Sequence, residues 1–600
     1  MSNEKSIPTR ESIAPEYKWR LADIYATDEA WESDFAATSA AIKDMTQVQT
    51  SLSPAAESIL GVLRALDALY ETAERLYSYA RMRRDEDSRQ TGPQAMADRA
   101  ESLIVRVSAA TAFLRPALLQ MPEALLRSCA EHPDFAAYSR ILEDVLRSRP
   151  HTLPAEQEAL LAEASEVGGA SETIFTMLTE ADLRFPKILG EHGMETEVSE
   201  ARFHTLLTSH DARVRKDAYE AVMHTYSTYG NTLAATYGTS VKNDVFVARS
   251  HRFGSSLEAS LFGSEIPVAV YDALLTAINE RLPALNRYLR LKQRALGLDA
   301  LHLWDLYVDT TTNFSLKLSY DDAYSLVVDA VAPLGQAYTE TLLHAKDSGW
   351  VDVYENVGKH HGAYSWGPYG THPYVLMNFE GTLDSASTLA HELGHSMHSY
   401  LSNRAQPHAK ADYTLFSAEV ASTVNEILLS THLLKKYPEK AAQQSLLGSL
   451  LEHFRTTVFR QTLFAAFEKK AHEMQEHGEA LTNEALSDLY YGLNVQYYGD
   501  TCIVDDPVRH EWMRIPHFYR AFYVYQYATG FSAAVSIARR ILREGQPAVE
   551  GYMRFLSAGG SLPPLDALRL AGVDMATPAP VREALDWFED ILMEFERVQA

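Results

Sequence analysis

The chain has 600 residues, 46% of them apolar, which is enough material for one large or several ordinary domains with substantial hydrophobic cores. Its 54 basic and 80 acidic residues give a formal net charge of -26, a poor match for polyanions, so nucleic acid is excluded as an expected partner. The two cysteines, Cys129 and Cys502, exclude a disulfide framework, and the absence of a signal-peptide pattern and of a membrane-spanning run predicts a cytoplasmic protein without a membrane partner.

Helical periodicity dominates the first part of the chain. Between about residues 28 and 161, apolar side chains recur every three or four positions, as at Ile59, Leu63 and Leu66. This is the pattern of helices that bury one face. Prolines punctuate the later part of the stretch and separate the predicted helices from one another. We therefore expect an all-helical region here.

A short β-hairpin is predicted after these helices. Residues 183–188 and 195–198 have strand-forming patterns, and a turn bounded by two glycines separates them. We place a domain boundary near this point. It divides a helical N-terminal region, residues 1–195, which ends in the hairpin, from a second and largely helical region, residues 196–600.

The main β signal of the chain lies further on, before a predicted helix. Residues 362–367 and 373–379 are rich in aromatic and β-branched side chains, which favours short strands. The helix that follows is expected to begin at an N-cap formed by Asp384 or Ser385. The predicted fold is therefore mainly α, with a small β-sheet beside this helix. Further long helices are expected at residues 417–435, 439–477, 482–495 and 518–543.

The helix after the sheet carries the pattern His-Glu-x-x-His, from His391 to His395. At 3.6 residues per turn, the two histidines lie on one helix face, where two imidazoles share a zinc ion in metallopeptidases. Glu392, between them, is then placed to hold a zinc-bound water and take its proton. Five residues arise by chance often enough that the motif alone does not establish the function.

A catalytic zinc normally has three protein ligands, so a third side chain is required. His398 lies on nearly the same helix face, but three ligands from two consecutive turns would strain a tetrahedral site, which favours a supporting or packing role. Glu419 and Glu426 lie two turns apart in a predicted buried helix, where an ionised carboxylate needs a cation. The longer metzincin motif is excluded, because it requires glycine at position 398 and histidine at the position of Leu401. A glutamate is therefore the expected third ligand.

Four separated motifs resemble those of the oligoendopeptidase F family, in the group that includes thimet oligopeptidase and neurolysin. They are Pro-Tyr-Val-Leu-Met-Asn-Phe at residues 373–379, Thr-Leu-Ala-His-Glu-Leu-Gly-His-Ser-Met-His-Ser at 388–399, Ala-Glu-Val-Ala-Ser at 418–422 and Ile-Pro-His-Phe-Tyr at 515–519. The resemblance extends through nearly the whole chain. It implies a large helical zincin-type peptidase with a deep substrate channel.

The resemblance also implies the roles of the residues around the metal. His391, His395 and Glu419 match the family's zinc ligands, for one Zn²⁺ per chain, and Glu392 matches its general base. Glu426 is then a carboxylate that orients a ligand histidine. The implied activity is endopeptidase cleavage of internal bonds in short unfolded oligopeptides. A zinc exopeptidase, of carboxypeptidase or dipeptidase type, and a non-catalytic helical peptide-binding protein are the alternatives. The oligomeric state is left open.

A late segment of the chain matches the part of the family that stabilises the tetrahedral intermediate. His517 matches the family's histidine, and Tyr519 and Tyr525 are the best matches for its tyrosines, with Tyr523 as an alternative. The predicted strand 373–379 is expected to lie beside the substrate backbone and to be extended by it.

Overall fold

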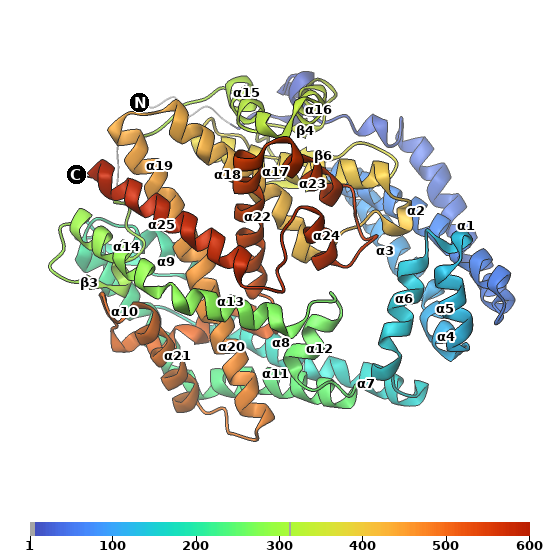
Figure 1. Ribbon diagram of the computed structural model, residues 1–600, viewed down its shortest axis with the longest axis horizontal. Helices are drawn as coiled ribbons and strands as arrows, with labels where there is room; N and C mark the ends of the chain where they lie inside the picture. Colours follow the sequence, from blue (N-terminus) through green and yellow to red (C-terminus); the bar gives the residue numbers. More distant parts are fainter. Residues whose placement is uncertain (1–6, 311–313, 600) are drawn as a thin grey trace. The chain divides into compact units, whose positions relative to one another are not determined.

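Helices form most of the protein in the computed structural model, which describes residues 7–310 and 314–599 (Figure 1). Within the described residues, the strands are short and form two two-stranded sheets and one three-stranded sheet. The prediction of a mainly α fold is confirmed. The deep substrate channel expected from the family resemblance stays a prediction.

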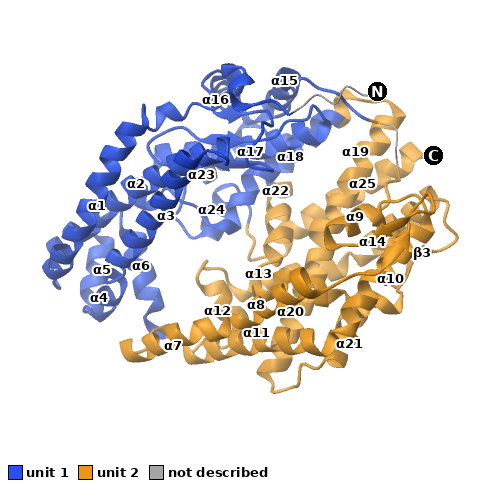
Figure 2. Cartoon of the chain, turned by 180° about the vertical axis from the view of Figure 1, so that it is seen from behind, with its two compact units in different colours: residues 1–150, 315–433, 537–573 blue, residues 151–314, 434–536, 574–600 orange. Residues whose placement is uncertain are grey.

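The chain forms two compact units, and each unit combines three separate stretches of sequence (Figure 2). Unit 1 contains residues 1–150, 315–433 and 537–573, and unit 2 contains residues 151–314, 434–536 and 574–600. Helices α18 (Leu415–Lys436) and α22 (Tyr525–Glu544) contain residues of both units. The boundary predicted near residue 195 falls within the first stretch of unit 2, and it stays a prediction.

Unit 1 begins with three long helices that pack on one another. These are α1 (Asp28–Ser51), α2 (Ala56–Glu86) and α3 (Thr91–Thr111). The apolar stripe of α2 is buried, and Met45 of α1 and Val107 of α3 pack into the same cluster. The predicted helical region is therefore confirmed. The other helices wholly in unit 1 are α4 (Leu114–Gln120), α5 (Glu123–Glu131), α6 (Ser139–Ser148), α15 (Tyr320–Ala330), α16 (Gln336–Asp347), α17 (Leu383–Ala405), α23 (Gln546–Leu556) and α24 (Pro564–Leu570).

One stretch, Thr91–Gln120, is long and apolar enough to be a candidate membrane span by length and composition alone. In the structure this stretch is not one helix, because α3 ends at Thr111 and α4 begins at Leu114. Leu103, in the middle of α3, is fully buried in the core that α3 shares with α1 and α2. Helices in the core of soluble proteins pass the same composition test, so the stretch assigns no membrane contact.

A three-stranded sheet lies beside α17, as predicted. It consists of β4 (Val351–Asp352), β6 (Tyr374–Leu376) and β5 (Tyr364–Trp366), in that order, and both β5 and β6 contact α17. The central strand β6 pairs in parallel with β4 and antiparallel with β5. The expectation that a substrate extends strand 373–379 is therefore wrong, because both edges of that strand are already paired. The outer strands of this sheet are β4 and β5.

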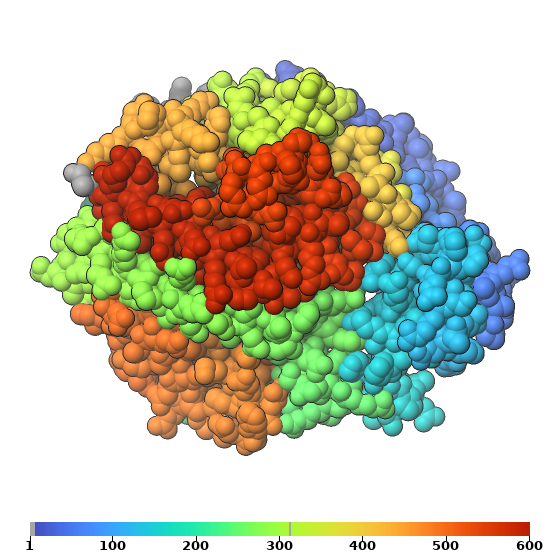
Figure 3. Space-filling view, in the orientation of Figure 1, coloured from blue at the N-terminus to red at the C-terminus, as the bar shows by residue number. Residues whose placement is uncertain are grey.

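The segment that completes unit 1 comes from much later in the chain. Helix α23 packs against α17, and the Gln406 amide donates a hydrogen bond to the Ser557 carbonyl at 2.8 Å. In the space-filling view, the orange-red surface of residues 537–573 lies beside the gold surface near residue 400 (Figure 3). Helix α17 thus packs against a segment of unit 1 that follows residues 434–536 of unit 2 in the sequence.

Unit 2 is built around α11 (Gly230–Ser250) and α20 (Gln461–Glu476), which pack together and stack Tyr237 on Phe467 with ring centroids 5.9 Å apart. The other α-helices and strands that lie wholly in unit 2, within the described residues, are α7 (Ala155–Gly168), α8 (Ala170–Thr176), β1 (Lys187–Leu189), β2 (Glu195–Glu197), α9 (Glu200–Leu207), α10 (Ala212–Thr228), α12 (Ser256–Phe262), α13 (Val268–Glu280), α14 (Leu282–Ala295), β3 (Leu301–His302), α19 (Lys440–His453), α21 (Asn483–Tyr498), β7 (Cys502–Ile503) and α25 (Ala579–Gln599). The antiparallel pair β1–β2 confirms the predicted hairpin.

The last predicted helix begins seven positions later than the sequence pattern suggests. Residues Pro516–Tyr519 form a short 3₁₀ turn, η12, and α22 begins only at Tyr525. Between them, Phe522 has φ of 57°, which is incompatible with an α-helix. The prediction of a helix from residue 518 is therefore wrong at its start, because a left-handed residue interrupts the backbone where side-chain periodicity alone shows no break.

Candidate metal centre

Helix α17 begins at a tight turn followed by a threonine cap. Gly381 has φ of 75°, which favours glycine, and the hydroxyl of Thr382 accepts a hydrogen bond from the Ser385 amide at 3.1 Å. The N-cap is therefore Thr382, and the prediction of Asp384 or Ser385 is wrong by two or three residues. Asp384 lies in the first turn instead, where its charge stabilises the positive end of the helix dipole.

The glycine of the His-Glu-x-x-His motif allows α17 and α18 to approach closely. A Cβ atom at Gly394 would lie 2.6 Å from the Cα atom of Ser422 and 2.7 Å from the Ala421 carbonyl oxygen. The two helices are also joined by the Asn425 amide, which donates to the Ala390 carbonyl at 3.1 Å. This contact places the glutamates of α18 opposite the histidines of α17.

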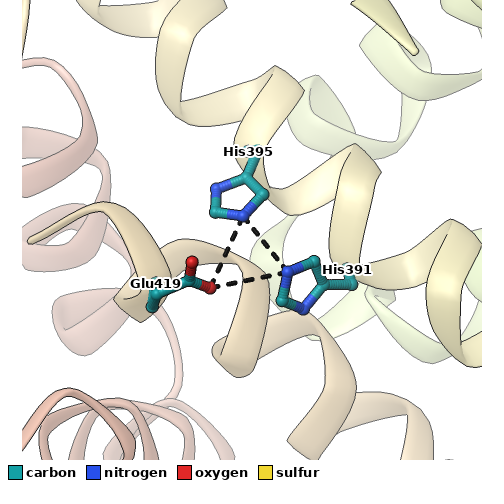
Figure 4. A group of neighbouring side chains, drawn as sticks. All are labelled: His391, His395 and Glu419. Carbon is teal, nitrogen blue, oxygen red and sulfur yellow. Dashed lines mark hydrogen bonds and ion pairs between the residues drawn. The ribbon is translucent and has the colours of Figure 1, made fainter. Parts of the chain in front are cut away.

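Three side chains converge where the two helices meet (Figure 4). The Nε2 atoms of His391 and His395 lie 3.2 Å apart, and Oε2 of Glu419 lies 3.5 Å from each of them. Within the described part of the chain, this trio is a group of side chains whose spacing suits a shared metal ion. All three belong to unit 1.

The spacing of these three atoms fits a tetrahedral zinc ion. Zinc bonds to imidazole nitrogen and carboxylate oxygen at about 2.0–2.2 Å, so two ligand atoms of a tetrahedral site lie about 3.4 Å apart. The observed separations of 3.2 and 3.5 Å lie on either side of that value. Two imidazoles and one carboxylate are also a donor set typical of catalytic zinc, with one position left for water or substrate.

Glu426 fixes the orientation of one histidine from behind. Nδ1 of His391 donates to Oε1 of Glu426 at 2.8 Å, so Nε2 points toward His395 and Glu419. Burial lowers the pKa of His391, but the hydrogen bond and charge of Glu426 outweigh burial and raise the pKa to about 9. The imidazole therefore has the electron density expected of a good metal ligand.

The pKa values of Glu419 and Glu392 shift in opposite directions. The hydrogen bond from His395 is the largest influence on Glu419 and, despite burial, its pKa falls to about 2, which keeps it ionised. Glu392 is only 7% exposed, and burial raises its pKa despite the two neighbouring histidines. One glutamate thus favours cation binding, and the other is a stronger base than an exposed glutamate.

His398 lies outside the trio. It is 1% exposed, and its ring stacks on Tyr413 with centroids 3.6 Å apart and planes 5° from parallel. Burial lowers the pKa of His398 to about 3, so the ring is neutral at physiological pH. These surroundings agree with the packing role that was favoured for it over metal ligation.

The late residues predicted to stabilise the intermediate lie in unit 2, and their surroundings differ sharply. The rings of His517 and Tyr523 are nearly parallel, with centroids 6.3 Å apart, and His517 is exposed. Tyr519 instead shares a hydrogen bond with Thr236 at 2.8 Å. Tyr525 is buried, and its ring packs on Tyr271 with centroids 5.0 Å apart.

Sequence reasoning did not select Tyr527, whose ring contacts both His517 and Tyr523. Its ring lies edge-on to Tyr523, with centroids 5.5 Å apart, and edge-on to His517 at 6.4 Å. We call His517, Tyr523 and Tyr527 the aromatic cluster. The sequence does show that Tyr523 and Tyr527 are four residues apart. This spacing indicates a ring contact only once the backbone before Tyr525 is known.

The chain resembles known proteins in family pattern, in sequence and in structure. Residues 205–587 match the model described as peptidase family M3, and residues 118–185 match the model described as oligopeptidase F. The first match covers more than half of the chain, and together they include the trio and the aromatic cluster.

Relatives match over essentially the full length. Oligopeptidase PepF of Bacillus subtilis is 42% identical, covering 100% of this chain and 90% of the relative, and group B oligopeptidase PepB of Streptococcus agalactiae is 38% identical, covering 98% of both. A solved structure from Chlamydophila abortus is 33% identical, covers 99% of this chain and 100% of that one, and has a TM-score of 0.93. Oligoendopeptidase-F from Enterococcus faecium is 35% identical, covers 95% and 99%, and has a TM-score of 0.72. The chain therefore belongs to peptidase family M3 and is a metallopeptidase.

Proposed function

We propose that the protein is a zinc endopeptidase that hydrolyses internal bonds of short unfolded oligopeptides. The observation that carries the proposal is the convergence of His391, His395 and Glu419 at separations of 3.2 and 3.5 Å, with Glu392 between the two histidines in the sequence. Family M3 implies zinc as the cofactor. The names of the relatives, oligopeptidase and oligoendopeptidase, support oligopeptides as the substrates.

We assign one zinc ion per chain to the trio, with Glu426 as the residue that orients His391. Bound zinc supplies Lewis acidity, which polarises the scissile carbonyl and lowers the pKa of water. The ionised Glu419 carboxylate and the Nε2 lone pairs of the two histidines supply the ligand atoms. The Nδ1–H group of His391 donates to Glu426, and this hydrogen bond leaves the Nε2 atom of His391 available as a ligand.

Glu392 is the general base of this proposal. Its carboxylate accepts a proton from the attacking water and passes it to the nitrogen of the leaving amine, so that no covalent intermediate with the protein is needed. Burial supports the role, because it raises the pKa of Glu392 and so strengthens it as a base. The same side chain thus serves both proton transfers of one turnover.

The aromatic cluster is proposed to donate to the oxygen that gains negative charge in the transition state. The pKa of His517 is lowered by desolvation and by the charges of Arg520 and Arg460, which keeps the imidazole neutral and able to donate one N–H. Tyr523 and Tyr527 contact His517 and offer hydroxyl donors. Tyr519 and Tyr525, the first choices from the sequence, stay predictions with weaker support, because one is bonded to Thr236 and the other is buried.

Strand β5 is the proposed pairing edge for the substrate backbone in unit 1. It is an outer strand, and the Ser365 hydroxyl lies 2.8 Å from the hydroxyl of Ser396, which follows His395 in α17. An extended peptide paired with β5 would therefore run beside the metal-site helix. The acidic composition and low cysteine content support peptide turnover in the cytoplasm, without nucleic acid or membrane as partner.

A doubly end-blocked peptide tests the proposal. The zinc-loaded enzyme is expected to cleave it internally, and a chelator is expected to abolish cleavage, with both outcomes read by mass spectrometry of the products. Cleavage restricted to peptides with a free end would establish the exopeptidase alternative. Tight binding without hydrolysis by a zinc-loaded protein would establish a non-catalytic peptide-binding protein.

A further inference from the structure

The loop that precedes α22 has an unusual backbone. Residues 520–524 join η12, which carries His517, to α22, which carries Tyr527. Within the loop, Phe522 has φ of 57°, a left-handed conformation that is strained for a bulky side chain. Such a conformation persists only where the surroundings hold it in place.

One peptide unit of this loop is held from both sides. The amide of Phe522 donates to Oε1 of Glu468 at 2.7 Å, and the hydroxyl of Ser260 donates to the Ala521 carbonyl at 3.0 Å. The two bonded groups belong to the same peptide unit, between Ala521 and Phe522. The ring of Phe522 is also buried, 4.5 Å from the ring of His472 between centroids.

Among the residues that the structure describes, Glu468 has no ionic partner that would explain its burial. It is 0% exposed, and burial raises its pKa well above the ordinary value. Its other oxygen, Oε2, has no hydrogen-bond partner among residues 7–310 and 314–599. His472, one turn further along α20, is paired with Asp244 at 3.2 Å instead. The observed bond of Glu468 is thus the one to the strained loop.

A buried carboxyl group with one oxygen unpaired destabilises the fold relative to an apolar side chain of similar size. Packing alone therefore gives no reason for glutamate at this position. The contact with the loop gives such a reason, because Oε1 of Glu468 accepts from the backbone between His517 and Tyr523, two members of the aromatic cluster.

We propose that Glu468 is a positioning residue of the peptidase, which holds the peptide unit between Ala521 and Phe522 so that His517 and Tyr523 keep the arrangement needed to stabilise the transition state. The inference rests on the proposed function of the aromatic cluster. Glu468 acts through the loop and touches neither metal nor substrate in this scheme. Its contribution lies in the acceptor oxygen Oε1, which receives the Phe522 amide.

Substitution of the acceptor tests the proposal. Glu468→Leu removes the acceptor at similar volume and is expected to lower kcat at least about tenfold, with KM changed by less than about threefold, because the lost interaction is made in the transition state. Glu468→Gln keeps an acceptor oxygen and is expected to stay within about threefold of the wild-type kcat. A Glu468→Gln variant as impaired as Glu468→Leu would overturn the assignment to the acceptor.

Thr462→Val provides the matched control for stability. Thr462 is fully buried in the same helix, and its hydroxyl donates within the helix, to the Val458 carbonyl at 2.7 Å. The Thr462→Val substitution is expected to lower the melting temperature without lowering kcat. If Thr462→Val and Glu468→Leu reduce kcat alike at equal zinc content, Glu468 has only a structural role and the proposal fails.

Two further measurements separate this inference from the proposed function. The Phe522 amide is expected to lose hydrogen-exchange protection in Glu468→Leu and to keep it in Glu468→Gln; unchanged protection in the leucine variant contradicts the anchor. In the His517→Ala background, Glu468→Leu is expected to cause little further loss of kcat, whereas simple addition of the two effects contradicts coupling through the loop. A normal kcat for His517→Ala itself would refute the role proposed for His517, while the exchange experiment would still decide whether Glu468 is the anchor.

Discussion

Around the metal trio, neighbouring carboxylates of the same chemical type have different properties because their partners differ. Glu419 accepts from His395 and has a pKa of about 2, whereas the buried Glu392 has a raised pKa. Glu426 bonds the far nitrogen of His391 at 2.8 Å. The proposed cation ligand, base and orienting group therefore differ in environment and not in residue type, and each difference leads to a separate mutational expectation.

Replacement of Glu392 by glutamine should remove the base and leave the metal ligands intact. The expected result is a loss of about 10²–10⁴-fold in kcat, the range typical of general acid–base catalysis, with zinc still bound stoichiometrically. Steady-state kinetics together with elemental analysis of the same preparation provide the check. Substantial hydrolysis by a zinc-replete Glu392→Gln enzyme, free of wild-type contamination, would contradict the assignment.

Replacement of Glu426 by alanine should weaken metal binding without removing a ligand. Loss of a carboxylate that orients a metal-bound histidine typically costs about 10–100-fold in affinity. A competitive titration with a chelator of known zinc affinity measures this change. The comparison variant is Glu419→Ala, which is expected to bind zinc more weakly still; equal affinities for the two variants would mean that Glu426 is itself a ligand.

At the scale of secondary structure, α17 and α18 form the metal site through a contact that depends on one glycine. The backbone of α18 at Ser422 leaves no room for a Cβ atom at Gly394. The atoms that a new methyl group would meet are main-chain atoms, which cannot move aside as a flexible side chain can. The spacing between the two helices therefore determines whether Glu419 reaches the histidines.

Substitution of Gly394 by alanine should separate these helices. We expect a destabilisation of about 1–3 kcal/mol, the usual range for overpacking, and a loss of zinc affinity that exceeds the effect of an equally destabilising change elsewhere in unit 1. Thermal unfolding and zinc titration of the purified variant test both parts. Normal zinc affinity in a folded Gly394→Ala protein would show that the contact is not what positions Glu419.

The elements were largely predictable where local pattern determines them. Amphipathic periodicity identified the helices of residues 28–161, and aromatic and β-branched composition identified the strands before α17. The pattern failed where a tertiary contact decides the backbone, as at Phe522, whose left-handed conformation is held by Glu468 from 54 positions away. It failed for strand 373–379 as well, because composition shows that a strand exists but not which strands pair on either side of it.

The candidate site was predictable to a similar, uneven extent. Helical spacing and chemistry identified the two histidines, and family resemblance was needed to choose Glu419 over Glu426. The tyrosines differ in contacts that a local sequence pattern cannot show. Tyr523 and Tyr527 contact each other, and Tyr523 stacks with His517, whereas Tyr519 bonds Thr236 and Tyr525 packs on Tyr271. The sequence thus selected candidates that share one helix face, whereas the choice among the tyrosines depends on distant packing and stays a prediction.

At the scale of the whole molecule, folding stability should depend on pH through His408, a half-buried histidine that lies between His395 and Glu419 in the sequence. His408 donates to Asp67 at 2.6 Å and to Glu74 at 3.1 Å, joining two distant stretches of unit 1. Burial lowers its pKa, but the two carboxylates outweigh burial and raise it to about 9. As pH rises, the unfolded chain, with a histidine pKa of about 6.5, therefore loses this proton at a lower pH than the folded state does.

The sign of the effect follows from these two values. The stabilisation is complete below a pH of about 6.5, decreases as pH rises, and is lost above about 9; its size is on the order of 2 kcal/mol. His408→Gln, which keeps hydrogen bonding but cannot be charged, is expected to lower the melting temperature at pH 6 and to match the wild type near pH 9.5. A stability difference that is the same at both pH values would contradict the prediction.

The interleaved make-up of unit 1 determines when the metal centre is completed during protein synthesis. Both helices of the trio have been synthesised once residue 436 is added, yet α23, which packs on α17, begins only at Gln546. A nascent chain therefore holds the His-Glu-x-x-His helix with one of its packing partners missing until more than a hundred further residues of unit 2 have been added. A chain ended at residue 536 is accordingly expected to neither fold unit 1 cooperatively nor bind zinc tightly, and peptidase activity should arise only at the end of translation.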